Sequence, residues 1–227
     1  MKAVILAAGM STRLRSLIPK PLTTLINGRK IMDYQVERLA GIVGEKNIYV
    51  IVGYKKDMIM EAFPNLTFVY NNAYALNNTA KSLHRALSRI DEDTIWTNGD
   101  VFFETGALNL LVKSKTSACL VNKNKCGDEE IKYTLNGSGF IDKISKEVKN
   151  GLGEAVGINL IKKNDLPNFV RELEKVGEKD YFEKALENLT KNNKIELAAI
   201  DIGNNFVKEI DFQEDLVEVE SFLKDGK

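Results

Sequence analysis

The sequence predicts an α/β protein built on one Rossmann-like mixed sheet, mostly parallel and flanked by helices. Continuous apolar runs at residues 3–8 and 48–52 each stop at a glycine, which is typical of parallel strands covered on both faces. Segments with helical spacing alternate with such runs through the N-terminal half, and this alternation is the rhythm of βαβ units. We therefore expect helices joined to the sheet by right-handed crossovers.

The expected elements follow one another in short steps along the chain. The first strand covers residues 1–8, with Val4, Ile5 and Leu6 as its apolar centre, and the first helix covers residues 31–40. Further strands are expected at residues 48–52, 66–69, 94–98, 117–121, 131–135, 158–161, 197–202 and 207–210. Further helices are expected at residues 56–62, 78–88, 165–176, 180–192 and 212–223.

Length and pattern favour one domain over two. A chain of 227 residues can bury a substantial core without disulfides or a structural metal. No linker or low-complexity tract interrupts it, so we expect a single domain over residues 1–227 with a strand-rich insertion around residues 115–160. The charged stretch 113–132 is interpreted as a solvated hairpin.

Composition excludes several classes of function. The 32 Lys and Arg residues balance the 32 Asp and Glu residues, which argues against a nucleic-acid partner because that needs excess positive charge. Cys119, Cys126 and His84 cannot form a zinc site, so both cysteines are expected to be reduced thiols. The run at residues 3–8 is too short for a signal peptide or a membrane span, and a cytoplasmic location is expected.

Polar and glycine residues stand directly after the expected strands. Gly9, Gly53, Asn71 and Asp100 each follow one, and ligands of parallel sheets bind beyond the carboxyl ends of the strands. These residues are therefore expected to gather at one edge of the sheet.

The stretch after the first strand suits a phosphate. Residues 6–14 read LAAGMSTRL, in which small residues and Gly9 let backbone N–H groups approach a phosphate or base, and Arg13 adds a forked cation. The spacing matches neither the dinucleotide fingerprint nor the P-loop. The alternative interpretation is a plain turn with a surface arginine.

Lys20 lies between two prolines in the sequence Pro19-Lys20-Pro21-Leu22. The prolines restrict the backbone and so the directions in which the ammonium can point. A compact ammonium held in this way stabilises negative charge on a phosphoryl group. A solvated loop lysine is the alternative.

Together these two motifs resemble the nucleotidyltransferases that activate sugar 1-phosphates and related phosphoesters. Ser11 stands where that family often has a second glycine. The stretch 71–83, which reads NNAYALNNTAKSL, resembles the N-N-x-x-S-L segment of the cytidylyltransferase branch, which includes phosphocholine and inositol-1-phosphate cytidylyltransferases. The resemblance implies that CTP and a small phosphomonoester, most simply inositol 1-phosphate, react to give a CDP-alcohol and pyrophosphate. Phosphocholine, a hexose 1-phosphate and a non-catalytic nucleotide-binding module remain alternatives, and a homodimer remains open.

The resemblance also implies roles for individual residues. Lys20 and Arg13 are the expected catalytic residues, with Lys20 at the α-phosphate and Arg13 at the β- and γ-phosphates. The expected nucleotide-binding residues are Leu6, Ala7, Ala8, Gly9, Ser11, Thr12, Arg13, Asn72, Asn78, Thr79, Ser82 and Gly99. Asn78 and Ser82 carry amide and hydroxyl groups that read the edge of a pyrimidine, although Asn78 also suits a helix N-cap.

Two acidic residues are expected to hold Mg²⁺. Asp100 in the sequence Thr97-Asn98-Gly99-Asp100 resembles the family's metal-binding aspartate, and Asp211 in the stretch 209–216, EIDFQEDL, resembles the residue that completes the site. Carboxylates, waters and substrate phosphates are the usual Mg²⁺ ligands. The alternatives are a turn residue for Asp100 and a helix cap for Asp211.

A further group resembles the acceptor-binding segments of relatives. The expected acceptor-binding residues are Lys146, Glu154, Asp180, Tyr181 and Glu183. Carboxylates bind the hydroxyls of a polyol or the cation of choline, and a tyrosine adds a cation–π face. For each of these, an ordinary surface residue is the alternative.

Overall fold

In the computed structural model, residues 1–10, 18–124, 126–127 and 130–224 are described. Ser11, Thr12 and Arg13, which were expected to bind the nucleotide, lie outside these ranges. Among the described residues, no helix is long and apolar enough to cross a membrane.

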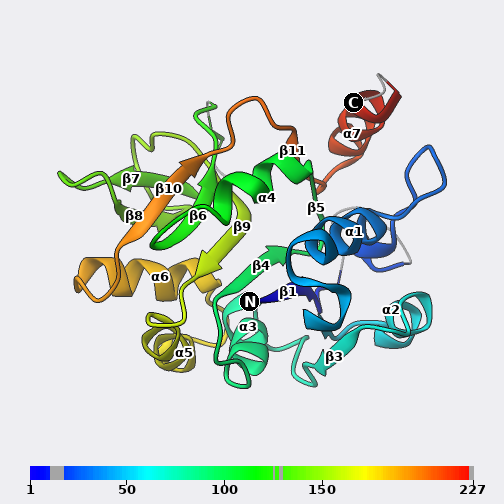
Figure 1. The fold of residues 1–227 in the computed structure, drawn as a ribbon, viewed down its shortest axis with the longest axis horizontal. Helices are drawn as coiled ribbons and strands as arrows, with labels where there is room; N and C mark the ends of the chain where they lie inside the picture. The colour runs from blue at the N-terminus through cyan, green and yellow to red at the C-terminus, as the bar shows by residue number, and fades with distance from the viewer. Residues whose placement is uncertain (11–17, 125, 128–129, 225–227) are drawn as a thin grey trace.

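A seven-stranded sheet forms the centre of the molecule (Figure 1). Its order is β10-β6-β9-β4-β1-β2-β3, and β9 runs antiparallel to its neighbours β4 and β6 while the other pairings are parallel. The prediction of a mostly parallel mixed sheet is confirmed. The bounds of its strands are β1 Lys2–Ala7, β2 Ile48–Val52, β3 Thr67–Tyr70, β4 Thr94–Asn98, β6 Ser117–Val121, β9 Ala155–Ile161 and β10 Leu197–Asp201.

Helices cover both faces of the sheet, as the βαβ rhythm predicts. Alternate residues of β1 face opposite sides, so Val4 packs in one core cluster and Ile5 in the other. One face is covered by α3 Thr79–Leu87, α5 Leu166–Lys175 and α6 Phe182–Lys191. The other is covered by α1 Ile31–Val43, α2 Lys56–Ala62 and α4 Thr105–Leu111.

Two small ribbons and a C-terminal helix complete the described fold. The antiparallel ribbons are β5 Val101–Phe103 with β11 Val207–Glu209, and β7 Lys132–Leu135 with β8 Ile141–Ser145. Helix α7, Gln213–Lys224, follows β11 and packs Val219 into a third apolar cluster beside α1. Short 3₁₀ turns occur at Lys20–Leu22 and Glu45–Asn47.

The structure corrects several sequence-based expectations. Strands β5 and β8 and helix α4 were not predicted, and β9 begins at Ala155 rather than at residue 158. The segment 113–132 is not a solvated hairpin, because its apolar part, Ser117–Val121, is a wholly buried strand between β9 and β10. Within residues 115–160, where a strand-rich insertion was expected, β6 and β9 belong to the central sheet, and β7 and β8 form a ribbon of their own.

Candidate active site

A pocket of about 550 Å³ opens at the carboxyl ends of the parallel strands. Gly9, just past β1, and Asp100, just past β4, both line it. Gly53, after β2, packs beneath the same edge, since a Cβ atom there would lie 2.6 Å from the carbonyl oxygen of Ala8. The expected gathering of strand-end residues is therefore present in the fold.

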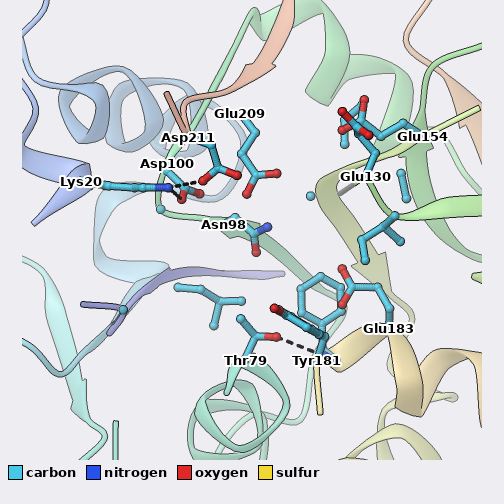
Figure 2. A pocket seen from close by; sticks show the side chains of 18 of the residues that line it. Lys20, Thr79, Asn98, Asp100, Glu130, Glu154, Tyr181, Glu183, Glu209 and Asp211 are labelled. Atoms are coloured by element: carbon cyan, nitrogen blue, oxygen red, sulfur yellow. Dashed lines mark hydrogen bonds and ion pairs between the residues drawn. The ribbon is translucent and has the colours of Figure 1, made fainter. Parts of the chain in front are cut away.

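Lys20 lies between two carboxylates at one side of this pocket (Figure 2). Its ammonium donates to Asp100 Oδ2 at 2.9 Å and to Asp211 Oδ1. Burial works against the charged amine, but the attraction and hydrogen bonds of the two carboxylates outweigh it and raise the pKa of Lys20. Three charged groups from distant parts of the chain thus form one partly buried ionic cluster.

Glu209 is a third acid of this cluster, which the sequence analysis did not assign. One carboxylate oxygen from each of Asp100, Glu209 and Asp211 lies within 4.8 Å of the other two. Burial, and then the negative charges of Asp100 and Asp211, raise the pKa of Glu209 well above its usual range. The signal was present in the sequence, because Glu209 and Asp211 are two positions apart at a strand end and so share one side.

The three carboxylates fit a hard divalent cation. Oxygen ligands in a compact group, with room for water and phosphate oxygens beside them, are the donors that Mg²⁺ takes. Burial is the main cause of the raised pKa of Glu209; the negative charges of Asp100 and Asp211 add to it, and Lys20 offsets it only in part. The expected pair Asp100 and Asp211 is thus brought together, with the carboxylate of Glu209 beside it.

The small residues after β1 form the wall next to this cluster. Leu6, Ala7, Ala8 and Gly9, which are expected to bind the nucleotide, all line the pocket. Gly99 also lines it, and its N–H donates to the carbonyl of Leu6 at 2.9 Å. An added Cβ at Gly99 would lie 2.6 Å from that carbonyl oxygen and 2.9 Å from Cγ of Pro21, so only glycine fits this close approach.

The start of α3 forms the neighbouring wall. Asn78 is the N-cap of α3, accepting from the Thr79 N–H at 2.9 Å, so the predicted cap is confirmed. The Thr79 hydroxyl accepts from the Phe182 N–H, and Thr79 and Ser82 line the pocket. The structure places Asn72 on the exposed surface and not among the pocket-lining residues, because it lies in the turn that follows β3.

Acidic and aromatic side chains line the far side of the pocket (Figure 2). Glu154 accepts from Asn122 Nδ2 at 2.9 Å, and burial raises the pKa of Glu154. The Lys146 ammonium lies 5.5 Å from the ring centroid of Tyr181. Glu130, which the sequence analysis did not assign, also lines this side.

Glu183 is the most deeply buried of these acids. Burial raises its pKa to about 7, and within the described part of the chain its Oε2 atom has no hydrogen-bond partner. Asp180 does not line the pocket as expected, because its carboxylate instead accepts from the Gly177 N–H at 2.7 Å and closes the turn before α6. Four of the five predicted acceptor residues therefore meet in the pocket.

The sequence model of the MobA-like NTP transferase domain matches residues 3–146. The chain belongs to this family. The matched region includes β1, Lys20, the start of α3 and Asp100, which form the wall and the ionic cluster described above.

Two curated relatives of this NTP transferase domain align with parts of it. The bifunctional protein GlmU of Methanocaldococcus jannaschii is 34% identical over 110 residues, which is 46% of this chain and 26% of that protein. The choline-phosphate cytidylyltransferase of Streptococcus pneumoniae is 33% identical over 120 residues, which is 50% of this chain and 51% of that protein. The chain thus matches about a quarter to a half of the length of these relatives.

The solved structure of the inositol-1-phosphate CTP transferase from T. maritima has a similar fold. It superimposes with a TM-score of 0.81 at 22% identity, covering 98% of this chain and 94% of the other. At that identity the likeness shows the shared architecture alone.

Proposed function

We propose that this NTP transferase domain is a CTP-dependent cytidylyltransferase that forms a CDP-alcohol from a small phosphomonoester, with inositol 1-phosphate as the favoured acceptor. The observation that carries the proposal is the Lys20 ammonium held between Asp100 and Asp211 on the wall of a large pocket. Membership of the family supports nucleotidyl transfer but does not name the base.

The reaction requires alignment and charge stabilisation more than acid–base chemistry. An ionised oxygen of the acceptor phosphate attacks the α-phosphorus of CTP, the bond from that phosphorus to the bridging oxygen breaks, and pyrophosphate leaves. Two polyanions have to approach each other, so positive charge at the α-phosphate lowers the barrier. Lys20 has that charge at neutral pH, because the two carboxylates outweigh burial and raise its already basic pKa. The role proposed for Arg13 stays a prediction.

Asp100, Asp211 and Glu209 are the residues that would hold Mg²⁺. The ion would supply Lewis-acid stabilisation to the phosphate oxygens. The carboxylates also contribute without it, because they hold the Lys20 ammonium at the pocket wall.

The far side of the pocket suits a polyol phosphate. Glu154 and Glu183 offer carboxyl oxygens to hydroxyl groups, and Lys146 offers a cation to the acceptor phosphate. Because Lys146 already lies over the Tyr181 ring, that ring is a poorer site for a second cation such as choline. Phosphocholine is the second candidate, favoured by the acids Glu154, Glu183 and Glu130 that line this side.

A pyrophosphate-release screen tests the proposal. Each of the four NTPs is crossed with inositol 1-phosphate, phosphocholine, glycerol 3-phosphate and glucose 1-phosphate in the presence of Mg²⁺. Release with CTP and inositol 1-phosphate is expected. Release with UTP and glucose 1-phosphate but not with CTP would overturn the assignment, and CTP binding with no release from any acceptor would indicate a nucleotide-binding module.

A further inference from the structure

A wholly buried amide, that of Asn71, lies beneath the wall formed by α3. Its Oδ1 atom accepts from the Ala73 N–H at 3.0 Å. Its Nδ2 atom donates to Asn77 Oδ1 at 2.8 Å and to Ser82 Oγ at 2.9 Å. The backbone N–H of Asn71 is tied to the carbonyl of Val52 at 2.8 Å, so the side chain is held in register with β2.

The direction of these hydrogen bonds follows from one backbone group. A backbone N–H only donates, so the atom of Asn71 that faces Ala73 has to be the carbonyl oxygen. The amide nitrogen then faces the other way and uses both its hydrogens, one on Asn77 and one on Ser82. Asn77 therefore points its side-chain oxygen toward Asn71, and Ser82 accepts from Asn71 through a lone pair of its hydroxyl oxygen.

Both neighbours are left with hydrogens to donate. Asn77 keeps its NH₂ group and Ser82 keeps its hydroxyl hydrogen, and both residues line the pocket. Among the described residues, neither the Asn77 NH₂ group nor the Ser82 hydroxyl hydrogen donates to an acceptor. The wall therefore offers two hydrogen-bond donors whose polarity is set from behind by Asn71.

The surroundings of this donor pair suit a flat ring. Tyr74 and the small residues Ala7 and Ala8 line the same pocket, and Ala8 packs in one apolar cluster with residues of α3. The ionic cluster around Lys20 takes the charged end of a nucleotide, so the uncharged wall is left for its base. Of the pyrimidines, cytosine presents two adjacent acceptors, O2 and N3, whereas uracil presents an N–H group at position 3.

We propose that Asn71 is a positioning residue that sets Asn77 and Ser82 as a donor pair, and that this pair selects cytosine over uracil. The inference rests on the proposed nucleotidyl transfer and deepens it by assigning the choice of base. Asn71 itself does not touch the nucleotide. It acts through the direction in which its two neighbours point.

Replacing Asn71 by its isosteric acid tests the inference. In Asn71→Asp the carboxylate still accepts from the Ala73 N–H, but it now accepts from Asn77 and Ser82 as well, which turns the Asn77 oxygen and a Ser82 lone pair toward the pocket. The ratio of kcat/KM for CTP to that for UTP is expected to fall by at least ~10-fold, because one mismatched donor is worth about that factor. Asn65→Asp makes the same charge change on the exposed turn before β3 and is expected to leave the ratio unchanged.

Ser82→Ala is a second variant that does not bury a charge. It removes one donor from the pocket and is expected to lower the CTP-to-UTP ratio in the same direction. Circular dichroism checks that each variant is folded, and if Asn71→Asp does not fold, Ser82→Ala alone decides. A ratio that stays unchanged in the folded variants, because both rates fall together, overturns the inference.

The failure of the inference and that of the proposed function have different signatures. Wild-type protein that turns over CTP and UTP equally well overturns the choice of base but keeps nucleotidyl transfer. Wild-type protein that turns over no NTP overturns the proposed function. In that case, calorimetric measurement of CTP and UTP binding still tests the donor pair. Preferential binding of CTP by the wild type that is lost in Asn71→Asp would support the inference. Equal binding of CTP and UTP by the wild type would contradict it.

Discussion

Replacing Lys20 by methionine removes the charge from the centre of the ionic cluster and keeps most of the length of the side chain. Only 11% of the Lys20 side chain is exposed, and its partners Asp100 and Asp211 are 19% and 20% exposed. Removing one member of a fully buried ion pair costs ~3–5 kcal/mol. Because the carboxylates keep some contact with water, we expect the free energy of unfolding to fall by ~2–3 kcal/mol.

Urea unfolding at pH 8 without divalent cations measures this loss. Pairing with the two carboxylates outweighs burial and leaves the folded pKa of Lys20 raised above 10.5. The stability that Lys20 contributes is therefore complete at pH 8 and is lost only as the pH rises through that raised value. Lys56→Met is the matched control, because Lys56 pairs with Asp57 at 2.8 Å but the two side chains are 35% and 76% exposed. Because that pair is exposed to water, Lys56→Met is expected to leave the free energy of unfolding nearly unchanged.

Added Mg²⁺ separates the electrostatic argument from a general packing defect. A divalent cation supplies positive charge to Asp100, Glu209 and Asp211, so it should stabilise Lys20→Met more than the wild type. The turnover number of the variant is expected to fall by roughly 10²–10³, as for other charge-stabilising groups. Unchanged stability together with near-normal turnover would show that Lys20 has neither role.

Three further outcomes are expected. Glu209→Gln should weaken Mn²⁺ binding, followed by electron paramagnetic resonance, because it removes one of three clustered carboxylates, and unchanged affinity would exclude Glu209 as a ligand. Glu183→Gln should leave the free energy of unfolding nearly unchanged at pH 4.5 and raise it by up to ~3 kcal/mol at pH 8. The reason is that the pKa of Glu183 is about 7 in the folded state against 4.5 in the unfolded state, so ionisation destabilises the wild type increasingly as the pH rises between those values. Denaturant titrations at both pH values check this, and an equal effect at both would contradict it. Gly99→Ala should lower the melting temperature, because the added Cβ would meet a backbone carbonyl. Gly41→Ala should raise the melting temperature slightly, because Gly41 lies in helix α1 with open space around it. The opposite order of the two melting temperatures would refute the packing argument.

Several elements were predictable because their signal is local. Strands β2, β4 and β6 and helix α2 have the bounds that the sequence predicts, since a continuous apolar run or a helical spacing marks each of them. Strand β5 and helix α4 were missed because they are short and follow one another directly after Asp100. Their state depends on partners far along the chain, as the pairing of β5 with β11 shows.

The residues of the candidate site also fall into those that the sequence could name and those that only the structure could place. Lys20, Asp100 and Asp211 could be named from motifs, but Glu209 needed the structure to place its carboxylate within 4.8 Å of the two aspartates. Asn72 and Asp180 belong to matching motifs, yet the fold places Asn72 on the surface and uses Asp180 to close a turn. A motif records which residues occur together and not which way their side chains point.

The sequence by itself determined the α/β architecture and the edge of the sheet at which the candidate site lies, because hydrophobic periodicity and strand-end glycines act over a few neighbouring residues. Only the tertiary structure decided how charge and hydrogen-bond polarity are arranged there. Lys20 meets Asp211 across 191 positions, and the direction of the Asn71 amide depends on a turn and a helix that pack around it. Electrostatic and hydrogen-bond energies depend on distances in space, and these exist only once the sheet has brought remote segments together.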